Sequence, residues 1–486
     1  MTNVLLRGSF WMLGMRWAMR CMGLFSTLVL ARLLTPEDFG LVAMAMTVAG
    51  LLQLIAWTGV DLAVIQNPHA TTDHYNTAWT VQIIQGMLVA VLLVVAAPLA
   101  AHYFNDPRVT TILWALALQP LVEGFENIGI VAFRKDLEFH KDFRFGVTKK
   151  LLSVAVVIVS ALVMRNYWAL VIGQVAGACI GVVLSYWVHP FRPRLNLREV
   201  GAIWSFSQWM LLSRIGAFLT QDIDKFIVAS TAGTTPMGNY HVAKELATLF
   251  TNELVFPIRR SLFPNLAQVS RDPTTMRNNV IALVSLVSTA CFAIGMGLSA
   301  VAEDFVLLLL GSQWTSAIVL VRWLALFGAV YGIGMAVEIV LHARNQGKLA
   351  VMEVWARVVV LAIALSVVAG EGDLSYLAMT RTLIAVVFLP ILLFLVARVT
   401  ALHLVELLRV MARPLLAGTA MWLLLESYDL DLGAHALNLL LDVPVGAVTY
   451  IAVLLGGWYL QGRPPGPEQI AIDWLTRRLR PGVEIP

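Results

Sequence analysis

The sequence predicts an all-α integral membrane protein with about fourteen transmembrane helices. Three observations lead to this class: a series of long apolar segments, loops of strongly asymmetric charge, and an internal repeat. Hydrophobic residues make up 59% of the 486 residues and charged residues only 13%, and the mean hydropathy is +0.78. The apolar runs are continuous rather than alternating, which excludes a membrane β-barrel and leaves helices as the spanning elements.

Each apolar segment is long enough to cross a bilayer, which takes roughly 20 apolar residues. The expected spans are residues 11–31, 41–62, 79–100, 109–131, 147–164, 168–188, 203–229, 239–258, 279–301, 315–341, 349–369, 374–397, 410–426 and 441–460. The first run follows Arg7 and has no small-residue cleavage site, so it is predicted to be a retained span rather than a signal peptide.

Basic residues are unevenly divided between the two sides of this topology. Most of the 34 Lys and Arg residues fall in alternate loops or in the C-terminal tail, whereas the opposite loops hold Arg32, Arg108 and Arg165. Because basic loops stay in the cytoplasm, both termini are predicted to be cytoplasmic, in the inner membrane of a bacterium. A net charge of +4 then reflects loops that face anionic lipid and requires no nucleic acid.

Short polar motifs mark the helix ends. Thr35-Pro36-Glu37-Asp38 is typical of a helix start, with a capping Thr, a proline in the first turn and two acids that favour the positive end of the helix dipole. Residues 105–107 and 370–373 predict tight turns. No loop is long enough for a soluble domain, and the tail after Gly462 is expected to be cytoplasmic with a short amphipathic stretch.

Metal and cofactor chemistry find no support in the motifs. Cys21, Cys179 and Cys291 lie within apolar segments and form neither a disulfide framework nor a metal cluster, and the nine histidines lack metal-ligand spacing. There is no phosphate-cradling glycine-rich loop of the GxxxxGK[ST] type. The sequence therefore predicts neither a cofactor nor a metal, and no ATP hydrolysis by this chain.

An internal repeat relates the two halves of the chain at an offset of 198 residues. Six helices separate the repeats, so both copies have the same membrane orientation and are related by an axis along the membrane normal. We expect a six-helix lobe in residues 1–200, a second in 201–400, two additional helices in 401–462 and a tail in 463–486. The offset pairs, among others, Trp11 with Trp209, Arg16 with Arg214, Ala31 with Ala229, and Gly40 with Gly238.

Charged side chains inside the spans are the candidate functional groups, because each costs roughly 2.5–3.5 kcal/mol at a helix centre on insertion scales. Arg16 and Arg20 lie on one face of the first helix. They either extend toward the cytoplasmic end or form a cationic wall of an internal cavity that binds an anionic substrate. Arg214, the repeat mate of Arg16, favours the second interpretation.

The seventh and eighth helices carry a second polar group. Structural ion pairing between neighbouring side chains is one explanation, and a polar lining with a carboxylate that couples to protons or cations is the other. Farther along, Glu353 and Arg357 have the spacing of a local ion pair. The residues of the second group are Asp222, Asp224, Lys225, Lys244 and Glu253; Glu123, Glu126, Arg322, Glu338 and Arg381 also require a polar interior.

The chain resembles the polysaccharide transporter (Wzx-type) flippases of the multidrug/oligosaccharidyl-lipid/polysaccharide superfamily. The resemblance covers nearly the whole length. Its most characteristic stretch is ARLLTPEDFG at residues 31–40, within a similar region that runs from Trp11 to Gln66. A second such stretch is QDIDKFIVASTAGTTPMGNYHVAKEL at residues 221–246, followed by FPIRRSLFPNLAQVSRD at 256–272. The resemblance implies two six-helix lobes in a V around a central cavity, with two further C-terminal helices.

The implied activity is movement of an undecaprenyl-pyrophosphate-linked oligosaccharide across the inner membrane for lipopolysaccharide, capsule or exopolysaccharide assembly, with a polymerase and glycosyltransferases as partners. Alternatives are a lipid II flippase or a multidrug or cation antiporter of the same superfamily, and, from another class, a membrane polysaccharide polymerase or ligase. Arginine suits pyrophosphate because its planar fork bonds two oxygens. The candidate substrate-binding residues are Arg16, Arg20, Arg214, Lys225, Lys244 and Arg322, and the candidates for ion coupling are Asp222, Asp224 and Glu253.

Overall fold

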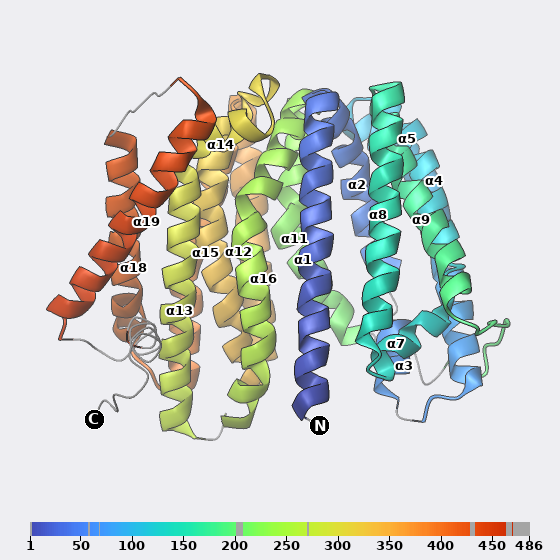
Figure 1. The fold of residues 1–486 in the computed structure, drawn as a ribbon, viewed down its shortest axis with the longest axis horizontal. Coiled ribbons are helices and arrows are strands. Elements are labelled where there is room, and N and C mark those ends of the chain that lie inside the picture. The colour runs from blue at the N-terminus through green and yellow to red at the C-terminus, as the bar shows by residue number, and fades with distance from the viewer. Residues whose placement is uncertain are drawn as a thin grey trace. The chain divides into compact units, whose positions relative to one another are not determined.

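The computed structural model describes residues 2–469 except 57–58, 68, 201–207, 270–271, 428–432 and 463–468. At a few other positions, including Arg214, the backbone is described but the side chain is not. Helices dominate the described residues, and no strand occurs among them. The all-α membrane fold expected from the sequence is thereby confirmed (Figure 1).

The chain divides into two compact units, residues 1–238 and 239–486. The helices of the first unit are α1 (Thr2–Leu33), α2 (Pro36–Ala56), α3 (Val60–Gln66), α4 (Thr72–Phe104), α5 (Arg108–Leu116), α6 (Leu118–Glu123), η1 (Ile128–Ile130), α7 (Val131–Lys135), α8 (Phe139–Met164), α9 (Trp168–Val188) and α11 (Gln208–Ala232). Helix α12 (Thr234–Gln268) begins in the first unit and continues into the second. The second unit holds α13 (Pro273–Ala300), α14 (Ala302–Leu309), η3 (Ser312–Trp314), α15 (Ala317–Ala343), α16 (Gly347–Val368), η4 (Ala369–Glu371), α17 (Leu374–Thr400), α18 (Leu404–Ser427) and α19 (His435–Leu460).

Every predicted span falls on one or more of these helices. Among the described residues, ten helices are long and apolar enough to cross a membrane, and an eleventh candidate is a bent pair that extends from Arg108 to Lys135. Helices α1, α11 and α12 have the length of a span but do not belong to this apolar set. The total of fourteen crossings therefore stays a prediction.

Helix boundaries differ from those expected in several spans, most notably the fourth and the fifth, and α2 ends at Ala56 so that the expected second span, 41–62, extends into α3. The fourth span is not continuous, because α5 and α6 are separated from η1 and α7 by a bend of 65°. The fifth begins at Phe139 rather than near residue 147, so Lys141 and Arg144 lie within α8 together with Lys149. Helix formation by these long-chain residues is favourable, and their flexible stems allow the charged groups to reach polar partners from within a helix.

Small residues set the packing of α8 against its neighbours in the first unit. Gly173, Gly177 and Gly181 of α9 are spaced by four residues, and they face Val157, Ser153 and Lys149 of α8, which have the same spacing. A Cβ atom on Gly173 would lie 2.7 Å from the Cβ of Val157. This glycine series therefore permits close packing of α9 on α8.

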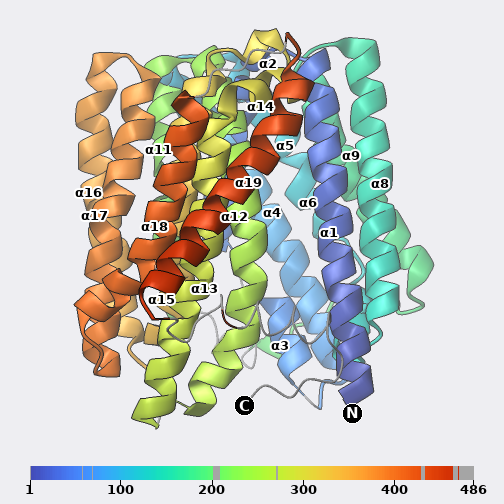
Figure 2. The same ribbon diagram turned by 60° about the vertical axis from the view of Figure 1, so that its left-hand side comes forward.

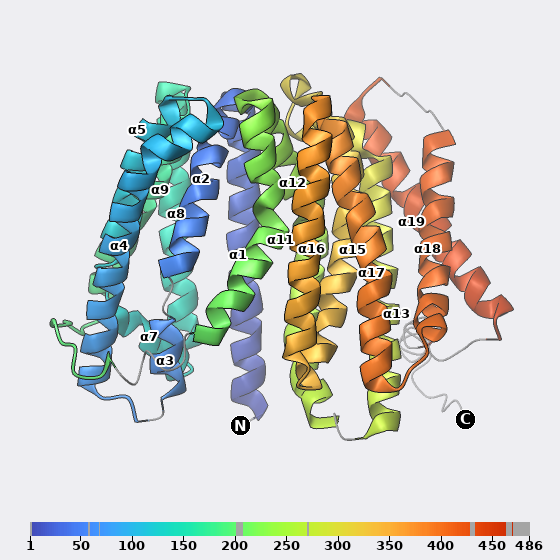
Figure 3. The same cartoon turned by 180° about the vertical axis from the view of Figure 1, so that it is seen from behind.

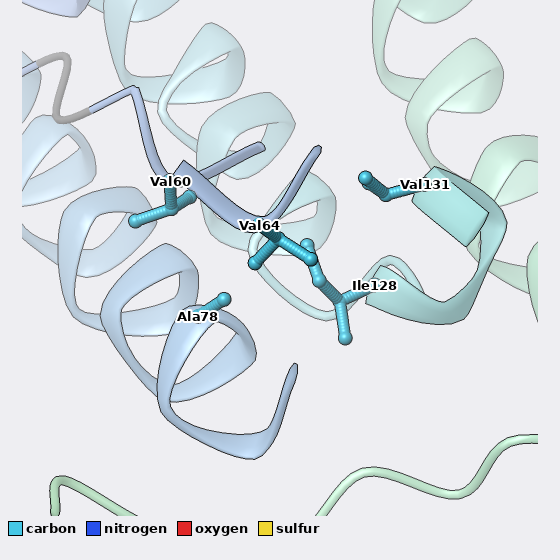
Figure 4. Close-up of a cluster of buried hydrophobic side chains, with 5 residues drawn as sticks. All are labelled: Val60, Val64, Ala78, Ile128 and Val131. Carbon is cyan, nitrogen blue, oxygen red and sulfur yellow. The ribbon is translucent and has the colours of Figure 1, made fainter. Parts of the chain in front are cut away.

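Helix α3 lies across one end of the first unit and closes a small apolar core. Val60 and Val64 of α3 pack with Ala78 of α4 and with Ile128 and Val131 from the far side of the bent span. Figure 4 shows these five side chains converging from three chain segments. The core fixes the bend against the base of α4.

The two C-terminal helices, orange to red in Figures 1 and 2, are anchored to α13. Ala417, Met421, Tyr450 and Leu454 form a buried core between α18 and α19. The Tyr450 hydroxyl also donates a hydrogen bond of 2.7 Å to the carbonyl oxygen of Thr289 on α13. These helices therefore pack as an integral part of the second unit.

Gly40 and Gly238, which the repeat predicts to be equivalent, contact each other's segments reciprocally. A Cβ atom on Gly40 would overlap the carbonyl oxygen of Thr234, and one on Gly238 would overlap that of Pro36. Thr234 and Pro36 are themselves separated by the repeat offset of 198 residues. Such an exchange is the pattern expected of two copies related by a two-fold axis.

The compact units do not coincide with the lobes expected at residue 200. The first unit extends to Gly238 because α11 packs on α2; Phe218 of α11, for example, lies against Gly50 of α2. The division into lobes by sequence repeat stays a prediction, as does the cytoplasmic tail at 463–486, of which all residues but Gln469 lie outside the described part.

Candidate functional site: polar groups within the spans

Arg16 and Arg20, the first candidates, are half-buried on α1. This helix packs lengthwise on α8 (Figures 1 and 2), where Trp11 meets the ring of Phe143 edge-on at 5.1 Å between centroids. Both residues take part in interactions within the protein. Their spacing on one helix face is confirmed, and a role in binding anions stays a prediction.

Helix α11 carries the densest group of candidates. Lys225 Nζ lies 2.8 Å from Asp222 Oδ1, and both side chains are about one-fifth exposed. Asp224, one position away, is 1% exposed. The ion pairing expected as the structural alternative therefore exists for Lys225 and Asp222. Arg214 lies in the same helix, although its side chain is outside the described part.

Helix α12 supplies Lys244 and Glu253. Lys244 is 9% exposed and Glu253 is half-buried, so both place polar groups below the protein surface. Each engages other groups of the protein. With α1 and α11, this helix completes the set that has span length but lies outside the apolar group. Most of the polar candidates thus lie on three helices that have the length of a span but are less apolar than the other spans.

Arg322 has a different setting from the other candidates. It lies near the start of α15, where its Nη1 is 3.2 Å from Glu426 of α18 and its Nη2 is 3.8 Å from Glu303 of α14. These three groups hold together one end of the second unit. The structure gives Arg322 this connecting role, while its assignment to substrate binding stays untested.

A polar cluster that sequence reasoning did not assemble surrounds the bend in the fourth span. We call it the bent-span cluster: Gln82, Glu123, Glu126, Asn127 and Lys149. Lys149 Nζ of α8 lies 3.0 Å from Glu126 Oε2. Gln82 of α4 donates to the main-chain oxygens of Glu123 at 2.9 Å and Glu126 at 3.3 Å. A side chain from another helix thereby satisfies carbonyl groups that the broken helix leaves open.

Asn127 provides further hydrogen bonds for main-chain groups at this break. The residue is 0% exposed, and its main-chain N–H donates to the hydroxyl of Ser185 at 2.9 Å. Its side chain donates to the carbonyl of Phe191 at 2.7 Å and accepts from the N–H of Gly129 at 2.9 Å. The signals in the sequence were Gly124 and the polar residues 123, 126 and 127 in an otherwise apolar run.

The second unit contains two further intramembrane cations with defined partners. Arg357 Nη2 lies 3.1 Å from Glu353 Oε2 one turn away on α16, which confirms the predicted ion pair. Arg381 of α17 is 2% exposed and lies over the ring of Phe327 on α15 at 4.3 Å from its centroid. Cation–π contact of this kind stabilises a desolvated guanidinium.

Arg108, the first residue of α5, is paired with neighbouring acids. It lies 2.8 Å from Glu37 and 2.7 Å from Asp106, and Asp106 also accepts the main-chain N–H of Arg108. Partial burial disfavours ionisation of Asp106, but the hydrogen bonds from Arg108 outweigh it and hold the pKa of this carboxyl below its usual range. The predicted start of α2 is also confirmed, since Thr35 and Asp38 hydrogen-bond to each other and α2 begins at Pro36.

Among the described residues, no group of three or more His, Cys, Asp or Glu is arranged to hold a metal ion. The membrane-spanning helices carry charged side chains that are paired with other groups of the protein. Charged groups within the spans of a polytopic membrane protein are typical of membrane transporters.

The comparisons agree with this class. A solved structure of the lipid II flippase MurJ in an inward closed conformation superposes with a TM-score of 0.71 at 12% identity, covering 92% of this chain and 99% of that one. A mutant form of the Vibrio cholerae MATE transporter VcmN superposes with a TM-score of 0.51 at 11% identity, covering 82% and 96%. At these identities the likeness concerns the fold alone.

Sequence comparison identifies the family. The profile of the family described as polysaccharide biosynthesis protein matches residues 29–319, and the chain belongs to this family. It is 25% identical over 436 residues to the succinoglycan biosynthesis transport protein ExoT of Rhizobium meliloti (strain 1021), covering 88% of both. It is 24% identical over 415 residues to the teichuronic acid biosynthesis protein TuaB of Bacillus subtilis (strain 168), covering 83% of this chain and 85% of that protein. The lipopolysaccharide biosynthesis protein WzxC of Escherichia coli (strain K12) is 24% identical over 331 residues, or 66% of each chain. The resemblance noted in the sequence is thus confirmed.

Proposed function

We propose that the chain is a flippase that moves an undecaprenyl-pyrophosphate-linked oligosaccharide from the cytoplasmic to the periplasmic leaflet of a bacterial inner membrane. The product would serve assembly of a surface polysaccharide. The observation that carries the proposal is the family match over residues 29–319, in a chain whose spans hold charged groups. The names of ExoT, WzxC and TuaB, each a protein of polysaccharide biosynthesis, support the substrate class.

The charged spans suit this cargo. A pyrophosphate headgroup and a hydrophilic glycan need polar groups along their path, while the polyprenyl tail stays in lipid. Arg16, Arg20 and Arg214 are proposed to bind the pyrophosphate, because arginine stays charged and bonds two phosphate oxygens at once. Lys225, Lys244 and Arg322 are proposed as additional cationic contacts.

Ion coupling is assigned to carboxylates near these cations. Asp224 is 1% exposed, and Asp222 is paired with Lys225, so a change in protonation or cation occupancy at either would alter the charge presented by α11. Glu253 on α12 is the third candidate. A carboxylate in a low-dielectric setting responds strongly to such changes, which makes it suited to coupling.

The chain is proposed to transport and not to catalyse covalent chemistry. Its substrate would come from membrane glycosyltransferases, and a polysaccharide polymerase would consume the product on the other side. Both termini are proposed to be cytoplasmic, in agreement with the distribution of basic loops.

Deletion of the gene tests the proposal. We expect one surface polysaccharide to disappear and its lipid-linked unit to accumulate on the cytoplasmic side, with both defects reversed by the wild-type gene. In a strain that lacks the first glycosyltransferase of that pathway, the deletion should have no further effect.

A lipid II flippase is the alternative within the same fold, which the chain shares with MurJ at a TM-score of 0.71. It predicts a different phenotype: arrest of cell-wall synthesis whether or not the polysaccharide pathway is present. Normal surface polysaccharide together with such arrest would contradict the proposed cargo.

A further inference from the structure

The second unit contains a small cavity bordered by two arginines at the ends of three helices. It measures about 430 Å³ and is lined by Arg344, Gln346, Leu349, Leu395, Arg398 and Val399. We call it the arginine pocket. It lies where α15 ends, α16 begins and α17 ends, and α16 and α17 run side by side in Figures 2 and 3.

The two arginines approach the pocket from different helices. Arg344 follows the last residue of α15, and its Nη2 donates a hydrogen bond of 3.2 Å to the carbonyl oxygen of Val399 near the end of α17. This bond links the guanidinium of Arg344 to the C-terminal end of α17. Arg398 lies in the last turn of α17 and is exposed. Two guanidinium groups on one cavity are suited to an anion with several oxygens, above all a phosphate.

The start of α16 places a positive helix pole beside the two arginines, which themselves offset the negative poles at the ends of α15 and α17. Gln346 occupies the position before the first turn and forms no capping hydrogen bond through its side chain. The helix runs for 22 residues, so its N-terminal end carries the positive pole of a full dipole. Phosphate groups are commonly bound where such an end meets basic side chains.

The rest of the lining is apolar and continues onto the lipid-facing surface. Leu349 and Leu395 lie beside the arginines in the pocket. On α17, Ile391 lies one turn before Leu395 and is 44% exposed, and Phe394, next to Leu395, is 52% exposed. Met352 on α16 is 58% exposed. A ligand with a phosphate head and hydrocarbon chains fits both parts, whereas free phosphate would use only the first.

We propose that the arginine pocket binds the phosphate headgroup of an anionic phospholipid, with the acyl chains lying along the exposed faces of α16 and α17. Basic pockets between membrane helices bind acidic lipid headgroups in this way. The six residues described as its lining are all different from those proposed for transport. The inference therefore stands apart from the identity of the cargo.

Binding to purified full-length protein tests the proposal. The protein is delipidated in a neutral detergent and titrated with phosphatidylglycerol, phosphatidylcholine or inorganic phosphate. Bound lipid is counted by native mass spectrometry, and the unfolding temperature is measured in a thermal denaturation assay. We expect saturable binding of phosphatidylglycerol and a higher unfolding temperature. Phosphatidylcholine, which carries no net charge, should produce neither effect.

Arg398→Gln should weaken phosphatidylglycerol binding about tenfold, since it removes a charge-assisted hydrogen bond. Arg398→Lys should weaken it less. The matched control is Arg409→Gln, which removes an exposed arginine of α18 that does not line the pocket. The unfolding temperature without lipid separates loss of binding from loss of folding, because Arg398 also lies at the negative end of the α17 dipole.

Two outcomes would overturn the proposal. Equal effects of phosphatidylglycerol and phosphatidylcholine, or a response to phosphatidylglycerol that survives in Arg398→Gln, would show that the pocket does not select the headgroup. Inorganic phosphate that protects as well as phosphatidylglycerol at equal concentration would assign the pocket to free phosphate and exclude the lipid.

Discussion

Single charged residues within the spans separate into those that packing explains and those for which we propose a function. Arg357 is paired with Glu353, and Arg381 lies on Phe327, so both are accounted for by the packing of the second unit. Arg16 and Arg20 are different because they are repeated in part by Arg214. A charge that costs roughly 2.5–3.5 kcal/mol and recurs in both repeats is better explained by function than by packing.

Arg16→Ala and Arg214→Ala should each abolish polysaccharide export while the amount of protein in the membrane stays unchanged. Lysine at either position should restore export only in part, because an ammonium group cannot bond two phosphate oxygens in a planar fork. Export is measured as surface polysaccharide in the complemented deletion strain. Arg194→Ala, which alters an exposed arginine outside the helices, is the control. Normal export by both alanine variants would remove the assignment and leave the fold unaffected.

Asp106 should make the stability of the protein depend on acid pH. Its folded-state pKa lies below the usual value of 3.8. Its contribution is therefore fully present above the unfolded pKa and is lost as the pH falls through the lower, folded pKa. We expect the unfolding temperature of the wild type to exceed that of Asp106→Asn by a constant amount above about pH 5 and by less below about pH 4. A difference that stays constant down to about pH 3 would contradict the role of this carboxyl.

At the scale of elements, the bent fourth span shows what the sequence could predict and what it could not. The apolar run from 109 to 131 predicts a span, and the structure places helices there. The bend depends on Gln82 and Lys149, which reach it from α4 and α8, and on Asn127 within the break, which donates to the carbonyl of Phe191 far along the chain. Spans follow from local composition, whereas partners across helices depend on the rotation of each helix about its axis, which composition does not specify.

The reciprocal glycines were predictable to a larger degree. The repeat paired Gly40 with Gly238 from sequence alone, and the structure shows that each faces main-chain atoms of the other segment. For Arg16 and Arg214, by contrast, the repeat predicts equivalent positions in the two halves but does not indicate which groups each side chain contacts. The candidate site therefore follows from the sequence as a list of residues, and its geometry does not.

Substitution of either glycine should destabilise the protein. In Gly40→Ala and Gly238→Ala the new methyl group meets a main-chain carbonyl that cannot move aside as a side chain can. Overpacking costs about 1–3 kcal/mol and more where the backbone must shift. We expect a lower unfolding temperature and less monodisperse protein on size exclusion in detergent. Gly456→Ala is the control, because its Cβ would meet open space on α19. Wild-type behaviour of both variants would contradict the contact.

At the scale of the whole molecule, topology is the property most open to test. The basic loops predict that residues 189–199 are cytoplasmic and that the turn at Gly372 is periplasmic. Short tags inserted after Arg198 and after Gly372 should be labelled by a membrane-impermeant reagent in intact cells only at Gly372. Permeabilised cells should be labelled at both. Labelling of the Arg198 site in intact cells would contradict the predicted topology and, with it, the proposed direction of transport.

The exchange between Gly40 and Gly238 also bears on ancestry. A protein made only of the first half would carry one such glycine, and two identical copies could meet through it, each glycine facing the Pro36 carbonyl of the other copy. The present chain keeps that arrangement with Thr234 in place of the second Pro36. A symmetric homodimer and a fused duplicate thus share one contact. The contact uses only the carbonyl groups of Pro36 and Thr234 and so leaves their side chains unconstrained, whereas neither glycine has room for a Cβ atom.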